Sequence, residues 1–414
     1  MKKSFFAAVF LIIAVPLTAQ WTPGDTYREY HWVTPAGGEA FLRVGGRYGY
    51  QAQPGKLPLV LQKGNELILP EQLDLEGAVR AEVTIEKVLS HEDTRNLRIA
   101  LNGHPPISVP EPATIPDPST EYMYHTDLTV PIPLEQLTAG RGLRFQLTVD
   151  STQRWGWPQN LVYGLAFRIF YAPAAAPPKV KVPQQPLAEI AYLSVNASSS
   201  VRHVDYILAG NDVDWSGRGV QHRKHWQTHR GEPHHTIGRA TDPGNDFSVR
   251  WNTAWLPDQD NFGVQARLLG EDGKYRVSEV TGGLRLAPRP YRIAVYAPGP
   301  APRNWVTRSG AFQQELMIFD SLETATTFQL HWVSWAACYS DGLFLNGHLL
   351  WHRIEDCYVY ATHSPEFSGH DVKALEQGRN IISTALTPRY RGEMVHGMEV
   401  QWPGVQLKVR YDER

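Results

Sequence analysis

The chain has 414 residues and a formal net charge of −2 at pH 7, a length that allows two to four domains. The near-neutral charge argues against a nucleic-acid partner, which would require a basic surface to displace counterions. Its 31 Pro and 34 Gly residues separate short β-branched and aromatic runs, a composition that predicts an all-β protein of the extracellular type.

Residues 1–20 have the pattern of a signal peptide. Lys2 and Lys3 precede an apolar run over residues 5–15, and small residues then favour cleavage after Ala19 or Gln20. The apolar run is too short to span a bilayer, and no later segment is apolar enough to cross a membrane. We therefore expect a secreted, periplasmic or cell-surface protein; a buried N-terminal strand is the less favoured alternative.

Two Pro-rich stretches divide the rest of the chain into three. Proline removes a ladder donor and favours extended backbone, so these stretches predict stiff linkers or edge segments. The expected domains cover residues 21–173, 188–290 and 291–414, with a linker over residues 174–187.

The outer thirds repeat one another. Three blocks recur in the same order: RIALNGH at 98–104 and GLFLNGH at 342–348, LTAGRGL at 137–143 and LEQGRNI at 375–381, GLAFRIFY at 164–171 and GVQLKVRY at 404–411. A duplicated domain is the economical explanation.

The blocks predict local structure. Asn-Gly in the first block favours a tight hairpin, because both residues tolerate positive φ. The last block alternates apolar and polar residues, which predicts a half-buried strand with Phe167 and Ile169 on one face and Arg168 and Phe170 on the other.

This order of motifs resembles the galactose-binding-like jelly-roll domains found as accessory modules in secreted glycoside hydrolases and as carbohydrate-binding modules. Residues 345–347 and 375–380 fit closely, whereas the first copy has Gly142 where the family usually has Asn. The resemblance implies two jelly-roll β-sandwiches. Such domains bind sugar, bind nothing or brace an enzyme, so the resemblance indicates a fold more than a ligand.

The middle third resembles a bacterial immunoglobulin-like domain. The stretch FSVRWNTAWLPD at 247–258 is similar to one common in that family, and an alternating strand over residues 262–268 leads into a Gly-Glu-Asp-Gly turn. The expected architecture is therefore all-β, with two jelly-roll sandwiches flanking an immunoglobulin-like sandwich that acts as a spacer.

Aromatic side chains beside arginines are the candidate sugar contacts, because a flat ring packs against the apolar face of a sugar. An arginine neighbour suits an acidic glycan. For Trp155 and Trp157 a place in the core is an equally good interpretation, and for Trp332 and Trp335 the core is favoured. The candidate ligand-binding residues are Tyr124, Arg154, Trp155, Trp157, Arg389, Tyr390 and Arg391.

A histidine-rich stretch covers residues 221–235. On a helix, His225 and His229 would share one face at i, i+4 and could hold zinc or copper. Gly and Pro within the stretch instead favour a solvated loop or ragged hairpin.

Just before it, Asp212, Asp214 and Ser216 resemble the start of a calcium loop. Arg223 occupies the twelfth position, where an EF-hand requires Glu, so an EF-hand is excluded. A simpler Ca²⁺ turn and an ordinary Asx-rich turn both remain, and calcium is the one cofactor that we expect with any support.

Cys338 and Cys357 flank the second Asn-Gly hairpin and could form a disulfide in an exported protein; two buried thiols are the alternative.

The sequence contains no nucleophile elbow, phosphate-binding glycine loop or His-Glu-x-x-His motif, so no catalytic residues are assigned. The leading hypothesis is a secreted, non-catalytic glycan-binding or surface-attachment protein with a polysaccharide partner. One alternative is a secreted polysaccharide-active hydrolase or lyase, metal-dependent through the histidine-rich stretch. The other is a structural cell-surface protein without a small ligand.

Overall fold

The computed structural model describes residues 22–35, 41–45, 57–90, 96–110, 124–149, 160–197, 200–213, 222–223, 227–234, 236–299, 312–335, 340–352, 360–386, 389, 399–401 and 403–412. These residues form β-strands in antiparallel pairs, which confirms the all-β prediction. Their helical segments are short 3₁₀ turns: η2 (Leu59–Leu61), η4 (Leu134–Gln136), η5 (Pro243–Asn245) and η6 (Asp371–Ala374). Over the same residues, no helix has the length and apolar character needed to cross a membrane.

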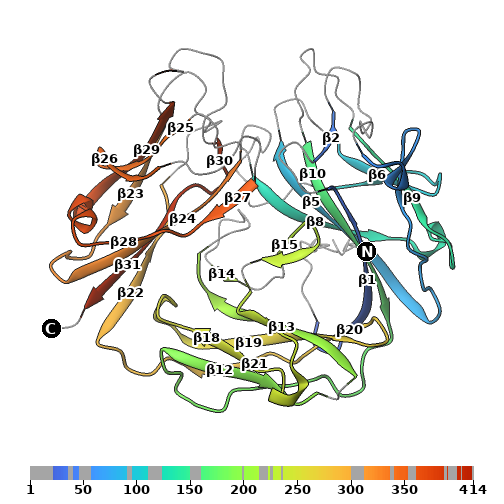
Figure 1. Ribbon diagram of the computed structural model, residues 1–414, viewed down its shortest axis with the longest axis horizontal. Helices are drawn as coiled ribbons and strands as arrows, with labels where there is room; N and C mark the ends of the chain where they lie inside the picture. The colour runs from blue at the N-terminus through green and yellow to red at the C-terminus, as the bar shows by residue number, and fades with distance from the viewer. Residues whose placement is uncertain are drawn as a thin grey trace, which may run out of the picture.

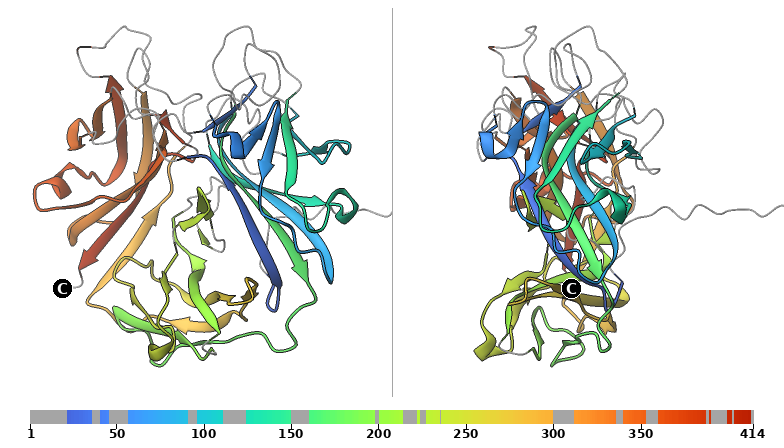
Figure 2. Two further views of the ribbon diagram at one scale, coloured as in Figure 1. Left: turned by 45° about the vertical axis from the view of Figure 1, so that its right-hand side comes forward. Right: turned by 90° about the vertical axis from the view of Figure 1, so that its right-hand side faces the viewer.

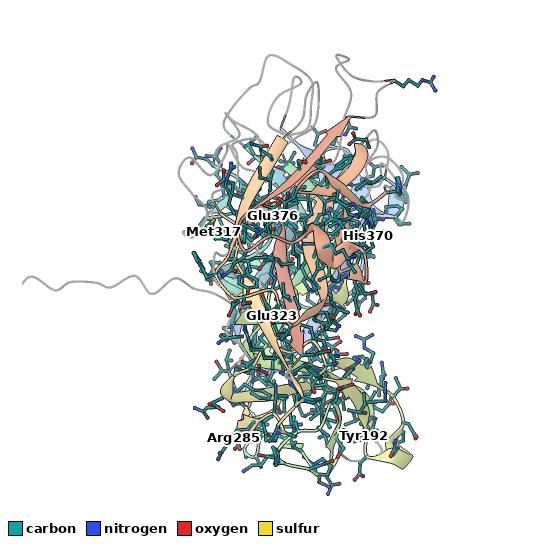
Figure 3. All side chains as sticks on the ribbon, turned by 90° about the vertical axis from the view of Figure 1, so that its left-hand side faces the viewer. Tyr192, Arg285, Met317, Glu323, His370 and Glu376 are labelled. Atoms are coloured by element: carbon teal, nitrogen blue, oxygen red, sulfur yellow. The ribbon has the colours of Figure 1, made fainter. Side chains whose placement is uncertain are left out.

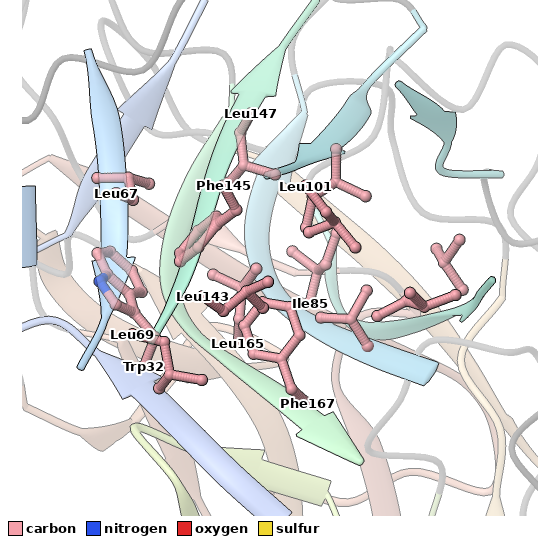
Figure 4. Close-up of a cluster of buried hydrophobic side chains, with 14 of the residues drawn as sticks. Trp32, Leu67, Leu69, Ile85, Leu101, Leu143, Phe145, Leu147, Leu165 and Phe167 are labelled. Carbon is pink, nitrogen blue, oxygen red and sulfur yellow. The ribbon is translucent and has the colours of Figure 1, made fainter. Parts of the chain in front are cut away.

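The N-terminal unit is built from two packed sheets. One has the strand order β1-β10-β5-β8 with β2 beside β10, and the other has the order β3-β4-β9-β6-β7. Alternate side chains of the two sheets meet in a core that includes Trp32, Phe145 and Phe167 (Figure 4). The strands are β1 (Thr26–Val33), β2 (Leu42–Val44), β3 (Gln62–Lys63), β4 (Glu66–Leu69), β5 (Ala78–Ser90), β6 (Arg98–Leu101), β7 (Ile107–Ser108), β8 (His125–Ile132), β9 (Leu143–Thr148) and β10 (Asn160–Tyr171).

The C-terminal unit has the same plan. One sheet has the order β22-β31-β24-β27, with β28 and β30 also paired to β24, and the other has the order β23-β29-β25-β26. Its core includes Phe328, Leu345 and Trp332, the last of which was expected there. The strands are β22 (Tyr291–Tyr296), β23 (Phe312–Ile318), β24 (Ala325–Trp335), β25 (Ser340–Leu345), β26 (His348–Trp351), β27 (Tyr360–His363), β28 (Glu366–Ser368), β29 (Gly378–Leu386), β30 (Glu399–Val400) and β31 (Gln406–Asp412).

The two Asn-Gly turns are built alike. Asn102 and Asn346 both have φ of 49°, and the glycines that follow have φ of 80° and 81°, the positive values of a type I′ turn. Each asparagine amide donates to the carbonyl before the next strand, from Asn102 to Gln136 and from Asn346 to Ala374, at 2.8 Å in both cases. Each asparagine therefore ties a hairpin to the 3₁₀ turn that precedes β9 or β29.

The middle unit packs two sheets around a core that contains Tyr206, Phe247 and Trp251. Its larger sheet continues into the N-terminal unit, because β20 pairs with β1 through Thr26 and Tyr27. The strands are β11 (Val180–Lys181), β12 (Ile190–Val195), β13 (Val201–Asn211), β14 (His222–Arg223), β15 (Gln227–His229), β16 (Glu232–His234), β17 (Gly238–Ala240), β18 (Val249–Asn252), β19 (Asp260–Gly270), β20 (Tyr275–Val277) and β21 (Thr281–Arg285).

The three units meet around the hairpin of β15 and β16. The outer units lie side by side, the middle unit lies across the same end of both, and β15 lies between the outer units (Figures 1 and 2). Among the labelled side chains, Tyr192 and Arg285 are on the middle unit and Met317 and His370 on the C-terminal one (Figure 3).

Two expectations require correction. β10 is buried along its whole length and not on one face only, because the middle unit covers the face that carries Arg168 and Phe170. The Pro-rich stretch over residues 174–187 contains β11, and its Val180 and Leu187 belong to the core of the middle unit. Part of that stretch is therefore folded into a sandwich.

Candidate functional site

Polar and aromatic side chains from all three units meet where the β15–β16 hairpin enters the gap between the outer sandwiches. We call this group the junction cluster. Its members are Glu86, His125 and Tyr163 of the N-terminal unit, His229 and His234 of the hairpin, and Tyr360 of the C-terminal unit.

Glu86 lies where β5 and β10 change register. The pairing shifts between Val162 and Gly164, so that Tyr163 is the extra residue of a β-bulge. A bulge turns side chains in a new direction and is frequent beside functional sites. Gly164 provides the space, since a Cβ at this position would lie 3.1 Å from Oε2 of Glu86.

The β15–β16 hairpin places His229 beside Glu86. Arg230 and Gly231 form its two-residue turn, with φ of 53° and 82°. His229 Nδ1 is hydrogen-bonded to Glu86 Oε1 at 2.6 Å, and the Arg230 backbone N–H donates to Oε2 at 2.7 Å. Both oxygens of this carboxyl are therefore occupied by the hairpin.

The C-terminal unit closes the cluster with Tyr360. Its hydroxyl is hydrogen-bonded to His125 Nδ1 at 2.9 Å, and its ring lies 4.7 Å from that of His229. The Tyr163 ring lies 5.0 Å from His229 and 6.2 Å from Tyr360. An aromatic group thus surrounds the Glu86–His229 pair.

Burial is the main cause of the pKa changes in the cluster, because desolvation disfavours the charged form of each group. It raises the pKa of Glu86 to about 8. It lowers the pKa of His229 and of His234 to about 4, and that of His125 to about 3. At neutral pH the cluster holds one protonated carboxyl and three neutral imidazoles. Perturbed titratable groups of this kind concentrate at functional sites.

A chain of buried ion pairs fixes the N-terminal unit to the middle unit. Arg168 Nε donates to Glu29 Oε2 at 2.5 Å, and Arg267 Nε donates to Asp205 Oδ2 at 3.0 Å. Arg267 also lies 3.6 Å from Glu29, which joins the two pairs. Burial alone would raise the pKa of Glu29, but Arg168 and its other positive neighbours lower it well below its usual value. The carboxylate is therefore charged in the folded protein.

Most of the site residues predicted from the sequence lie outside the described residues. Tyr124 has no exposed surface and accepts a hydrogen bond from Lys87 at 3.1 Å, so its ring does not present the open face expected of a sugar contact. Arg389 is exposed. Those outside the described residues are Arg154, Trp155, Trp157, Tyr390, Arg391, Asp214, Ser216, His225, Cys338 and Cys357.

The two metal hypotheses rest on residues with other partners. Asp212 forms an ion pair with Lys408 of the C-terminal unit and accepts from the backbone N–H of Val213 at 2.9 Å. His229 lies on a strand and not on a helix, so the proposed helical spacing from His225 does not apply. Within the described part of the chain, no group of three or more His, Cys, Asp or Glu side chains is arranged to hold a metal ion.

Sequence reasoning missed Glu86, Tyr163 and Tyr360. One signal was available in β5, where Glu86 and Lys87 interrupt an otherwise regular alternation of apolar and polar residues. Adjacent charges inside a strand are typical of a bulge, where two neighbours no longer point to opposite faces in the regular way.

No family model matches this chain, and no curated protein matches it. Among solved structures, it is similar to BuGH86 in complex with neoagarooctaose, at 7 % identity and a TM-score of 0.23, over 56 % of this chain and 34 % of that one. It is also similar to BpGH86A, a β-porphyranase of glycoside hydrolase family 86 from the human gut bacterium Bacteroides plebeius, at 12 % identity and a TM-score of 0.23, over 57 % and 37 % of the two chains. Likeness at this level carries no argument about function.

Proposed function

We propose that the chain is an exported glycan-binding protein whose ligand site is the junction cluster. In this proposal the outer units are jelly rolls of the galactose-binding-like type, and the middle unit is an immunoglobulin-like domain that holds them in position. The observation that carries the proposal is the convergence of buried polar groups from all three units on the Glu86–His229 pair.

The polar character of the junction favours a ligand over a purely structural contact. Apolar residues of similar volume would hold the units together at least as well as buried polar and charged groups, which lose hydration when they are buried. A structural junction therefore has little need for a neutral carboxyl, three imidazoles and two phenols. A binding site needs such groups to orient its ligand.

The chemistry of the cluster suits a sugar. Tyr163 and Tyr360 are 1 % and 8 % exposed and pack their rings around His229, which has 19 % of its side chain exposed. Arg230 lies 5.2 Å from the centre of the Tyr163 ring, so a cation accompanies the aromatic surface. This pairing of ring and arginine is the one that the sequence led us to expect in loops near residues 155 and 390.

Affinity electrophoresis of the whole protein through gels that contain neutral or acidic polysaccharides tests the proposal. We expect retardation by at least one polysaccharide. Arg230→Asn removes the guanidinium but gives the turn an Asn-Gly sequence, which tolerates the same positive φ. It should weaken binding about tenfold or more, as expected for a lost charge-assisted hydrogen bond.

Tyr192→Ala is the matched control, because Tyr192 is an exposed aromatic residue of β12 in the middle unit and does not belong to the junction cluster. It should leave retardation unchanged. Migration unaffected by every polysaccharide, or equal loss in the control, would rule out the junction as a glycan site.

A further inference from the structure

The Glu86–His229 pair has the form of an imidazole oriented by a carboxyl group. His229 Nδ1 is held by Glu86, and no described residue forms a hydrogen bond with its other nitrogen, Nε2. The His229 side chain as a whole is 19 % exposed. An oriented imidazole with one free nitrogen is the arrangement that general-base catalysis requires.

The backbone around the pair is tightly constrained. The turn glycine Gly231 packs on His31, where an added Cβ would lie 3.2 Å from Nδ1. Arg230 and Gly231 both hold positive φ, and Gly164 packs against Glu86 from the opposite side. The imidazole is therefore positioned by strands on both sides and not by a free loop.

A proton donor and a cation adjoin the pair. Burial raises the pKa of Tyr360 well above its usual value, so its phenol is protonated, and its hydroxyl is hydrogen-bonded to His125. Arg230 lies over Tyr163, 5.2 Å from the centre of its ring, and also donates to the Pro35 carbonyl. With Glu86 protonated, this guanidinium favours an anionic sugar.

We propose that the junction cluster cleaves glycans containing uronic acids by β-elimination, with His229 as base, Tyr360 as acid and Glu86 as the positioning residue. This inference rests on the proposed glycan-binding function and extends it to a reaction. It requires no water, metal or oxidant as co-reactant.

The bonds and protons balance as follows. His229 Nε2 takes the proton from C5 of the uronate, and the C–H electron pair forms the C4–C5 double bond. The bond between C4 and the glycosidic oxygen breaks with its electrons on oxygen, which takes the Tyr360 proton. The proton on His229 is then transferred to Tyr360, which returns the imidazolium to imidazole and the phenolate to phenol. Arg230 stabilises the negative charge that develops on the uronate carboxylate.

The protonation of the pair sets the expected pH dependence. Below about pH 8, Glu86 carries a proton that it shares with His229 Nδ1, and Nε2 carries the imidazole hydrogen. Loss of one proton above this pH leaves a carboxylate bound to Nδ1–H and frees the Nε2 lone pair. The groups that face the pair are His31 of β1, His125 and Asp127 of β8, Tyr163 of β10, Arg230 and His234 of the hairpin, and Tyr360 of β27.

The test measures binding and turnover on the same samples. The whole protein is incubated with polygalacturonate, alginate, a glucuronan and a neutral β-glucan, and the ultraviolet absorbance of unsaturated uronate is followed from pH 6 to pH 10. We expect absorbance with at least one uronate polymer, none with the β-glucan, and a rate that rises through about pH 8.

Three variants separate catalysis from folding. His229→Asn keeps an amide to bind Glu86 but lacks a base, so it should still be retarded by the polymer while its rate falls about 100-fold or more. Tyr360→Phe should also keep binding and lose rate. Glu86→Gln should keep binding and remove the rise near pH 8. His370→Asn, an exposed histidine of the C-terminal unit, is the control and should change neither property.

Polymer binding by the unmodified protein without unsaturated product overturns the elimination and leaves the glycan site intact. New reducing ends without unsaturation, or full activity in His229→Asn, also overturn it. Absence of all polymer binding overturns both proposals.

Discussion

The two outer units share a strand order but attach to the middle unit by different means. Arg168 of β10 and Lys408 of β31 occupy equivalent positions in the repeated closing strand, and both are buried against the middle unit. Arg168 belongs to a chain of ion pairs that runs through Glu29 to Arg267. Lys408 forms an ion pair with Asp212 and also donates to the Trp255 carbonyl at 3.0 Å.

The difference shows what each copy contributes. The N-terminal copy supplies Glu86, His125 and Tyr163 to the junction cluster, whereas the C-terminal copy supplies Tyr360. The two copies therefore carry a cation at the same position of a repeated strand but bind the middle unit through different contacts. The N-terminal copy, which has the chain of ion pairs, also supplies more residues to the junction cluster.

The largest expected effect compares the two buried cations. Arg168→Met leaves Glu29 buried without its closest partner, so the free energy of unfolding should fall by about 3–5 kcal/mol. Lys408→Met should cost less, about 1–3 kcal/mol, because Asp212 keeps the Val213 N–H. Urea unfolding measures both.

A matched control is Arg202→Met, which breaks an exposed pair with Glu271 and should cost under about 1 kcal/mol. Equal losses at Arg168 and Lys408 would show that the ion-pair chain adds nothing to the N-terminal attachment.

An intermediate effect concerns pH. The buried histidines have lowered pKa values, so the unfolded chain binds more protons below pH 6.5, and stability should rise as the pH approaches that value. Glu86 has a raised pKa, so its contribution is complete below pH 4.5 and is lost as the pH rises to about 8. Four histidines, with His363 included, outweigh one carboxyl below pH 6.5, and among the described groups with a shifted pKa Glu86 is the one that titrates between there and pH 8.

At pH 6.5 the unfolded histidines are still half protonated, so stability should be greatest near pH 7 and decline by under about 1 kcal/mol between there and pH 8. Chemical unfolding at several pH values checks this. Glu86→Gln should abolish the decline above pH 7; a decline that persists in this variant would show that another group causes it.

The smallest effect compares the two Asn-Gly turns. Asn102→Ala and Asn346→Ala each remove a hydrogen bond to a 3₁₀ turn and place Ala at positive φ, so each should cost about 1–2 kcal/mol. Asn→Gly at the same positions restores the backbone freedom and should recover part of the loss. Thermal unfolding should show the larger loss for Asn346→Ala, because Asn346 also donates to Asn380 Oδ1 at 2.9 Å and the first copy has Gly142 at that position.

Local features could be predicted from the sequence because their causes are local. Asn346-Gly347 closes the expected two-residue hairpin between β25 and β26, and Phe167 and Ile169 point into the core while Arg168 points away from it. Turn chemistry and alternation depend on near neighbours, so a single sequence records them.

The junction could not be predicted, because it depends on contacts across hundreds of residues. Nothing local to Glu86 indicates that His229 will bind it, and Tyr360 meets His125 only after all three units are in place. For the same reason β10 was expected to be half-buried. The residues that cover its second face belong to the middle unit, which lies far away in the sequence.

The pairing of β20 with β1 has a mechanical consequence. The pairing of β1 and β20 through Tyr27 and Tyr275 joins the first two sandwiches by a continuous sheet, and the rings of these two residues stack 5.2 Å apart. The third sandwich is held to these two by side-chain contacts and by the chain leading into β22. A swing about this attachment would carry Tyr360 away from His125, which makes the tyrosine a natural reporter for fluorescence or crosslinking of an opening motion.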